Sequence, residues 1–202
     1  MYVPPEFELA DPQRALELIA RHPFATLLTC DEEVARVSHL PLIAQERDGG
    51  IVLVGHVARG NPHAQSILAG AAATAVFTGA HAFVSASWYV EPYATVPTWN
   101  YSAVHVSGRL QQSGAWDAVL ALSHAMERGP EAWDPQRLPV EYRERQLRGI
   151  VAFELRAEVI RAKAKLSQNR TEADRARVIE RLSASSDQTN RECADDMRRV
   201  WR

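Results

Sequence analysis

The chain has no long apolar run, few cysteines and little net charge, and each shortage excludes a class of protein. No apolar run approaches the roughly 20 residues that a membrane-spanning helix needs. The two cysteines, Cys30 and Cys193, are too few for a disulfide framework or a zinc cluster. A formal net charge of −2 gives no overall attraction to nucleic acid or to anionic membranes. The start, MYVPPEFELADP, is acidic and unlike a secretion signal, so we expect a cytoplasmic protein.

Several motifs of known chemistry are also missing. The sequence contains no HExxH motif, no GxSxG elbow, no Walker A loop and no GxGxxG fingerprint. The seven histidines show no spacing typical of metal ligands. The sequence therefore predicts no metal site and supports no conventional nucleophilic triad.

The patterns that are present predict strands with a few inserted helices. A helix begins after Asp11 and ends by His22, and Asp48-Gly49-Gly50 has the composition of a hairpin turn. Strand patterns cover residues 24–30, 34–43, 51–57, 73–79, 81–89, 99–112 and 150–162, and helical patterns cover 61–68, 115–128, 139–148 and much of 171–202. Strands and helices do not alternate as in a Rossmann-type sheet, so we predict an α+β fold built on a small β-barrel.

The segment GHVARGNPHA, residues 55–64, brings together a cation, a glycine without a side chain and the expected start of a helix. Asn61 can cap the following helix, and Pro62 suits its first position. Arg59 can make a bidentate phosphate contact, and Gly60 lets the backbone come close. The segment is a candidate phosphate site. The alternative interpretation is an ordinary capped helix beside a solvated arginine.

Two further segments carry candidate ligand-binding groups. In KAKLSQNR, residues 163–170, Lys163 and Lys165 lie on the same side of an extended chain and four polar residues follow Leu166. Such donors suit a phosphate or a ribityl chain, although a polar linker would have the same composition. In VPTWNY, residues 96–101, and in SWY, residues 87–89, aromatic rings could stack on a flat ligand or could pack in a core.

Taken together, these segments resemble a known family. MYVPPEFEL, SHLPL, GHVARGNPH, VSASWY, VPTWNYSAVHVSG and KLSQNR occur in the order found in the PaiB family, the FMN-binding negative transcriptional regulators. The resemblance runs from Met1 to beyond Arg170. It implies a split β-barrel of the pyridoxamine-phosphate-oxidase-like type with inserted and C-terminal helices, in a homodimer with FMN sites between the subunits. We predict a barrel domain over 1–170 and a helical segment packed on it over 171–202.

The resemblance also implies a set of cofactor-binding residues. The set comprises Arg59, Asn61, Lys165 and Ser167 on the phosphate side, Ser38, His39 and His56 in the cleft, and Thr98, Trp99, Asn100, Gln168, Asn169 and Arg170 near the ring or the ribityl chain. The chain departs from the family pattern at Gly60, Ala64, Ala86 and Ala164. At 64 and 164 an aromatic ring is lost, with stacking worth about 1 kcal/mol or more each. We therefore expect FMN retention to need a direct test.

Three functions remain open at this point. A regulator would use the arginine-rich C-terminal segment to contact DNA, although interspersed acidic residues favour a solvated helical face instead. That segment contains Arg170, Arg175, Arg177, Arg181, Arg191, Arg198, Arg199 and Arg202. A flavin-dependent oxidoreductase would use His39, His56 or His105 as proton donor, and no spacing singles one out. A degenerate flavin barrel would act through a partner.

Overall fold

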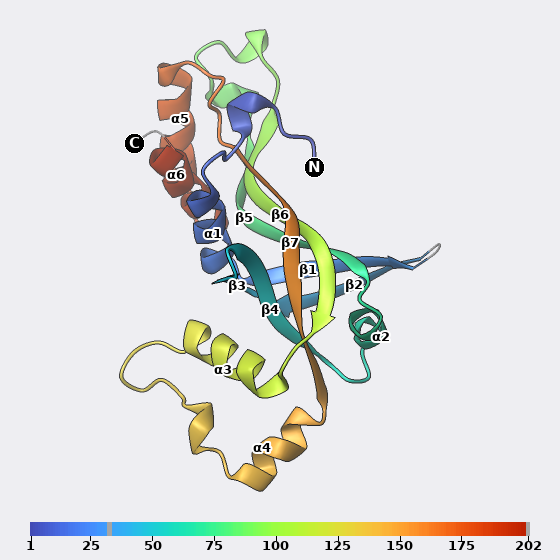
Figure 1. Cartoon of the computed structure of the whole chain (residues 1–202). Helices are drawn as coiled ribbons and strands as arrows, with labels where there is room; N and C mark the ends of the chain where they lie inside the picture. Colours follow the sequence, from blue (N-terminus) through green and yellow to red (C-terminus); the bar gives the residue numbers. More distant parts are fainter. Residues whose placement is uncertain (32–33, 201–202) are drawn as a thin grey trace. The chain divides into compact units, whose positions relative to one another are not determined.

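The computed structural model describes residues 1–31 and 34–200 (Figure 1). Trp201 and Arg202, the last two residues of the helical segment predicted over 171–202, lie outside the described residues. The chain forms two compact units. The first unit comprises Met1–Leu18, Thr78–Val104 and Arg161–Arg202, and the second comprises Ile19–Phe77 and His105–Ile160. The division into 1–170 and 171–202 stays a prediction.

The described strands form one antiparallel sheet. They are β1 (Phe24–Asp31), β2 (Val34–Pro41), β3 (Ile43–Arg47), β4 (Gly50–Ala58), β5 (Ala72–Val84), β6 (Thr98–Gln112) and β7 (Ile150–Lys165). Their order is β2-β1-β5-β6-β7-β4-β3, and β5, β6 and β7 contribute residues to both units. The β3–β4 turn confirms the predicted hairpin, because Asp48 and Gly49 both have positive φ and Arg47 pairs with Gly50.

Two predicted strand boundaries are wrong for identifiable reasons. The run at 34–43 is divided at Leu42, whose N–H donates to the carbonyl of Pro23 at 2.9 Å and whose side chain is buried. The runs at 73–79 and 81–89 are one strand that passes straight through Gly79. A Cβ at position 79 would overlap the Ser102 hydroxyl, so this glycine marks close packing and not a turn. Beyond Val84 the chain forms a short 3₁₀ helix, η2 (Ala86–Trp88).

The predicted helices are present with small shifts at their ends. They are α1 (Pro12–Arg21), α2 (His63–Leu68), α3 (Ala115–Met126), α4 (Val140–Leu147), α5 (Glu172–Ser183) and α6 (Gln188–Val200), with short 3₁₀ helices η1 (Pro5–Phe7), η3 (Pro92–Ala94) and η4 (Pro135–Arg137). Asp11 caps α1 by accepting from the Gln13 N–H at 2.9 Å, and Thr171 caps α5 by accepting from the Asp174 N–H. Among the described helices, none combines the length and apolar character needed to cross a membrane.

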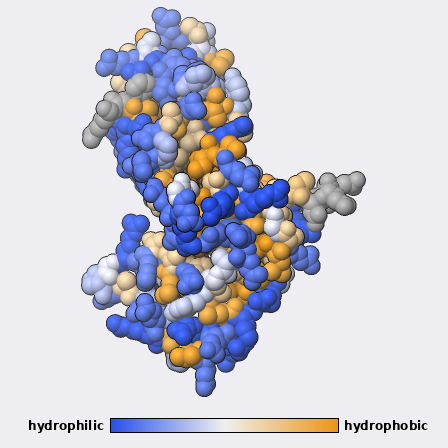
Figure 2. All heavy atoms as spheres, in the orientation of Figure 1, coloured by the Kyte–Doolittle hydropathy of each residue, from blue (hydrophilic) through white to orange (hydrophobic). Residues whose placement is uncertain are grey.

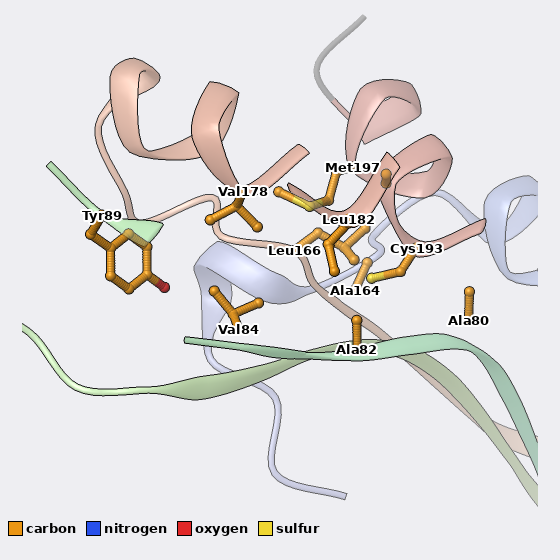
Figure 3. Close-up of a cluster of buried hydrophobic side chains, with 11 residues drawn as sticks. Ala80, Ala82, Val84, Tyr89, Ala164, Leu166, Val178, Leu182, Cys193 and Met197 are labelled. Carbon is orange, nitrogen blue, oxygen red and sulfur yellow. The ribbon is translucent and has the colours of Figure 1, made fainter. Parts of the chain in front are cut away.

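The first unit has a core between its strands and the last two helices. Figure 3 shows Val178 and Leu182 of α5, with Cys193 and Met197 of α6, directed toward the strand residues beneath them. The strand side is lined by small or branched residues, namely Ala80, Ala82, Val84, Ala164 and Leu166. The spacing of four residues within each pair places its two side chains on one face of the helix, and that face is buried. In the second unit, Val52 and Val54 of β4 pack with Ala118 of α3.

The two cysteines differ in environment, which gives a direct test of the fold. Burial raises the pKa of the Cys193 thiol to about 12, with Asp196 as the second cause, whereas Cys30 is exposed. Because the thiolate is the reactive form, we expect one thiol to react with an aromatic disulfide reagent in the native protein and both to react in denaturant. Reaction of both thiols at similar rates in the native protein would contradict the position of α6.

Candidate functional site

The thirteen predicted cofactor-binding residues fall into two groups, one in each compact unit. Ser38, His39, His56, Arg59 and Asn61 belong to the second unit. Thr98, Trp99, Asn100, Lys165, Ser167, Gln168, Asn169 and Arg170 belong to the first. Each group is described within its own unit.

In the second unit, Ser38 and Asn61 meet at the start of α2. The Asn61 amide donates to Ser38 Oγ at 3.1 Å, and its carbonyl oxygen accepts from the His63 N–H at 2.9 Å. Ser38 Oγ also lies 2.8 Å from His63 Nδ1. The predicted cap is shifted by one residue: α2 begins at His63 with Pro62 at the N-cap, and Asn61 precedes the cap while still accepting from the His63 N–H. β2 and the segment before α2, which are 23 residues apart in sequence, thus form one hydrogen-bonded group.

The structure adds three residues that the sequence interpretation missed. Arg36 Nη1 donates to Ser66 Oγ at 3.1 Å and to the Pro62 carbonyl at 3.3 Å. His63 and Ser66 are buried, and Arg36 is half-buried. We call Arg36, Ser38, Asn61, His63 and Ser66 the α2 cluster. One available signal was alternation, since positions 36 and 38 of a strand share a face.

Two histidines of the second unit, the buried His63 and the half-buried His56, favour the neutral form. Burial lowers the pKa of His56, and burial followed by the positive charge of Arg36 lowers the pKa of His63. Among the described residues, His63 Nε2 and His56 Nδ1 have no hydrogen-bond partner. His63 therefore offers the α2 cluster a buried ring nitrogen that a water molecule or a bound group would satisfy.

The lowered pKa of His63 predicts a loss of stability in acid. The unfolded chain takes up its histidine proton near the ordinary pKa of 6.5, before the folded chain does. The free energy of unfolding is therefore highest above that pH and decreases as the pH falls below it. It levels off below the pKa that His63 has in the folded protein. We expect the urea midpoint to drop between about pH 7.5 and about pH 5.5, and the drop to be smaller in His63→Asn. The exposed His124 gives the control, and a His124→Asn variant with the same effect would contradict the assignment.

The other predicted residues of the second unit lie in separate contacts. Arg59 donates from Nε to the Arg148 carbonyl at 2.7 Å and from Nη2 to the Ile150 carbonyl at 3.0 Å, so it holds its loop to the start of β7. His39 lies on the exposed face of β2, where Nδ1 is 3.1 Å from Thr26 Oγ1. The hydrogen bonds of Arg59 and His39 described here thus go to groups outside the α2 cluster.

In the first unit, Asn100 and Ser167 are buried and bonded to each other. The Asn100 amide donates to Ser167 Oγ at 3.0 Å and to the Met197 sulfur at 3.4 Å. Ser167 has φ +65°, a conformation that costs energy for a residue with a side chain. The pair therefore holds the KLSQNR turn to β6 and α6, which is a structural task. Its predicted contact with a cofactor stays a prediction.

Most of the other polar side chains of KLSQNR also contact groups of this chain. The Gln168 side chain bonds the Leu166 N–H and the Ala164 carbonyl, and the Arg170 guanidinium lies 4.8 Å from the Tyr89 ring centroid. Lys165 Nζ donates to Thr98 Oγ1 and to the Trp99 carbonyl, both at 2.6 Å. Asn169 is exposed.

The environment of Lys165 in the first unit disfavours its charged form. Burial lowers the pKa of its ammonium, and the positive charges of Lys163 and Arg170 lower the pKa further. An anion beside Lys165 would relieve that repulsion. Thr98, Trp99 and Lys165 thus form one contact group, with the Trp99 ring exposed.

The chemistry of both groups fits a flavin mononucleotide. The α2 cluster offers a guanidinium, hydroxyls and an imidazole with an unpartnered nitrogen, which suit a phosphate. The Trp99 contact group offers an exposed ring beside a cation, which suits a flat aromatic system with polar edges. Within residues 1–31 and 34–200, His, Cys, Asp and Glu side chains form no cluster of three suited to a metal ion.

Comparison with known proteins places the chain in a family. The family described as "Putative FMN-binding domain" matches residues 1–159. The chain is 32% identical over 203 residues to the protease synthase and sporulation protein PAI 2 of Bacillus subtilis, covering 98% of this chain and 96% of that protein.

Solved structures share the fold at low sequence identity. The flavocytochrome Anf3 of Azotobacter vinelandii has a TM-score of 0.59 at 14% identity, and the matched region covers 82% of this chain and 73% of the Anf3 chain. The FAD and heme binding protein of Mycobacterium smegmatis has a TM-score of 0.53 at 16% identity, over 78% and 73% of the two chains. Family match, near-full-length relative and sheet topology agree: the chain belongs to the FMN-binding domain family and has its split β-barrel fold.

Proposed function

We propose that this protein binds FMN and acts as a negative regulator of transcription of the PaiB kind, as a homodimer. The observation that carries the proposal is the 32% identity to the Bacillus subtilis sporulation protein over nearly the whole of both chains. The family match over residues 1–159 supports flavin binding in particular. The geometry of the α2 cluster supports it independently, because that cluster has the donors that a phosphate needs.

The α2 cluster would hold the phosphate group. Arg36 supplies the charge, Ser38 and Ser66 supply hydroxyls, and Asn61 keeps the chain in position by bonding Ser38 and the His63 N–H. Arg59 lies on the segment that leads into α2 and remains a proposed phosphate contact beside its two carbonyl bonds. When bound, FMN supplies a redox-active ring, and the protein's part is to bind, orient and shield it.

Within the first unit, a separate group of residues has the chemistry that suits a flavin ring or a ribityl chain. Thr98, Trp99 and Lys165 are joined by hydrogen bonds, and Asn169 is exposed next to them in sequence. The positions that depart from the family pattern, Ala64 and Ala164, are both buried. In this chain those positions belong to packed interiors, and their effect on flavin stacking stays a prediction.

An exposed apolar face on the β1–β2 hairpin supports the homodimer. Hydrophobic residues reach the surface at many points (Figure 2). On the hairpin, Phe24 pairs with Pro41 and Leu28 with Val37, and Phe24 is 69% exposed. Such a face is stabilised when a second copy covers it. Sedimentation at micromolar concentration tests this, and a species of 22.5 kDa alone would contradict the dimer.

Direct contact of the C-terminal arginines with duplex DNA has weaker support. Arg198 bonds Asp195 and the Ser183 hydroxyl, and Arg199 pairs with Asp196. Arg191 donates to the Ser185 carbonyl at 2.7 Å. These contacts match the expected solvated face with local pairing. A regulator built this way would reach DNA through other surfaces or through a partner.

The visible absorption spectrum of the purified protein tests the central proposal. We expect a flavin band after FMN is added and the excess removed, with one FMN per chain. If the protein retains no flavin at any FMN concentration, the proposal is contradicted, whether or not the protein binds DNA. Reduction of the bound flavin by NADH or NADPH without oxygen would favour the alternative, a flavin-dependent oxidoreductase.

A further inference from the structure

The chain has only two lysines, and they lie together on β7. Of the 23 lysine and arginine residues, all but Lys163 and Lys165 are arginines. The two lysines occupy alternate positions of the strand, so their side chains share one side of it. A lysine ammonium can lose its proton where its surroundings disfavour charge, whereas an arginine guanidinium stays charged. A basic side chain that can be neutralised in this way therefore occurs at one place in the chain.

Lys163 is held among aromatic rings. Its ammonium lies 5.2 Å from the ring centroid of Tyr101, 5.8 Å from that of Tyr2 and 5.9 Å from that of Phe7. Nζ also donates to the Tyr2 carbonyl at 3.2 Å, and the residue is only 6% exposed. We call Tyr2, Phe7, Tyr101 and Lys163 the aromatic cage. The faces of such rings attract a cation that has been taken out of water, so the cage holds Lys163 in its charged form in one place.

The aromatic cage joins the N-terminal segment to β6 and β7. Glu8 forms an isolated antiparallel bridge with Lys163, and the Leu9 N–H donates to the Ala162 carbonyl at 3.1 Å. Glu8 is exposed, and within residues 1–31 and 34–200 no ion pair connects a carboxylate to Lys163 or Lys165. The cage therefore fixes the charge of Lys163 without a carboxylate to neutralise it.

The fixed charge of Lys163 acts on Lys165. Lys165 Nζ donates to the Trp99 carbonyl at 2.6 Å. Burial lowers the pKa of Lys165, and the positive charges of Lys163 and then of Arg170 lower it further. The Arg170 guanidinium is itself held on a ring, 4.8 Å from the Tyr89 centroid. Two cations fixed on aromatic rings thus stand beside the cation that belongs to the Trp99 contact group.

We propose that Lys163 is a positioning residue of the flavin site: fixed in the aromatic cage, it acts through Lys165 on an anionic group of the cofactor. The inference rests on the proposed function, because it takes the Trp99 contact group as part of the site for FMN. Neighbouring cations without a carboxylate between them attract a ligand that carries negative charge, as FMN does. The aromatic cage makes the N-terminal segment part of the support of that site.

Amine labelling tests the effect on Lys165 without any cofactor. In Lys163→Met and in Lys163→Arg, Lys165 is the only lysine left in the chain. Acetic anhydride reacts with the neutral amine, so the rate of acetylation at Lys165, located by mass spectrometry, follows the pKa of that amine. Because the like charge at position 163 lowers this pKa, we expect the rate to rise at a higher pH in Lys163→Met than in Lys163→Arg. Coinciding profiles would overturn the inference.

Lys163→Gln separates the charge of Lys163 from its anchoring role. A glutamine amide can still donate to the Tyr2 carbonyl but carries no charge. We therefore expect the acetylation profile of Lys165 in Lys163→Gln to move to higher pH, as in Lys163→Met. A profile in Lys163→Gln that matches Lys163→Arg would mean that Lys163 only anchors the segment, and would overturn the inference. This variant also serves if the methionine variant does not fold.

Fluorescence titration with FMN tests the consequence for the site. We expect Lys163→Met to weaken binding about 2- to 30-fold, the range for residues that act through others, and Lys163→Arg to retain most of the affinity. Because Lys163 acts through Lys165, the substitution at 163 should cost less in a chain that already carries Lys165→Met. Arg161→Met is the matched control, since Arg161 is an exposed cation on the same side of β7.

Failure of the inference can be distinguished from failure of the proposed function. If the unchanged protein binds FMN and Lys163→Met binds it equally well, the proposed function stands and the inference is overturned. If the unchanged protein binds no FMN, both are contradicted. Equal losses in Arg161→Met and Lys163→Met would also overturn the inference, because net charge alone would then explain them. A circular dichroism spectrum shared by all variants shows that a loss reflects the site and not the fold.

Discussion

Replacing Gly108 by alanine is expected to destabilise the protein by about 3 kcal/mol or more, at the upper end of the cost of overpacking. Gly108 lies on β6, where the chain approaches β7 closely. A Cβ at this position would overlap the carbonyl oxygen of Arg156 and stand 2.9 Å from its carbonyl carbon. The obstacle is backbone, so no side chain can rotate away. Either the two strands separate or their ladder shifts.

Urea unfolding measures this effect against a control within the same chain. At Gly60 an added Cβ meets nothing within 4 Å and φ is not positive, so Gly60→Ala should change the free energy of unfolding by less than about 1 kcal/mol. Similar midpoints for the two variants would mean that β6 and β7 do not approach each other at Gly108.

The strand pattern of the sequence was informative wherever alternation was uninterrupted. On β6, which the sequence pattern placed at 99–112, the alternate positions Ser102, Val104, Val106 and Gly108 are all buried. The pattern failed at Gly79, because glycine occurs both at strand ends and inside closely packed strands. The predicted strand ended at this glycine, whereas in the structure β5 continues through it and the missing Cβ makes room for the Ser102 side chain. A single sequence cannot separate these two cases, because the partner lies on another strand.

The candidate site was predictable in composition and less so in detail. The sequence showed that GHVARGNPHA and KLSQNR contain hydrogen-bond donors suited to a phosphate. It did not show which partners these segments bond within the fold, since Asn100 and Ser167 are 67 residues apart and Arg36 and Ser66 are 30 apart. Arg36 was missed because a lone arginine on a half-buried strand is usually solvated. Its role depends on α2, whose position against β2 is a tertiary contact.

The structure changes which arginine should matter most for FMN. We expect Arg36→Met to weaken FMN binding roughly 10- to 150-fold, the equivalent of about 1.5–3 kcal/mol for a hydrogen bond to a charged group. Arg36 is half-buried beside Ser66 and His63, so its charge is poorly screened and a phosphate there would lose its main counter-charge. Flavin fluorescence quenching on titration measures the dissociation constant.

Arg59→Met should weaken FMN binding less than Arg36→Met does. Two of its nitrogens already donate to the carbonyls of Arg148 and Ile150, so it has fewer donors left for a phosphate, and its loss also loosens the segment before α2. Arg137→Met is the control, since that side chain is 88% exposed in η4. Equal affinities in all three variants would remove the phosphate from the α2 cluster. A larger loss in Arg59→Met than in Arg36→Met would instead place the phosphate beside the start of β7, because the Arg59 guanidinium bonds the carbonyls of Arg148 and Ile150 there.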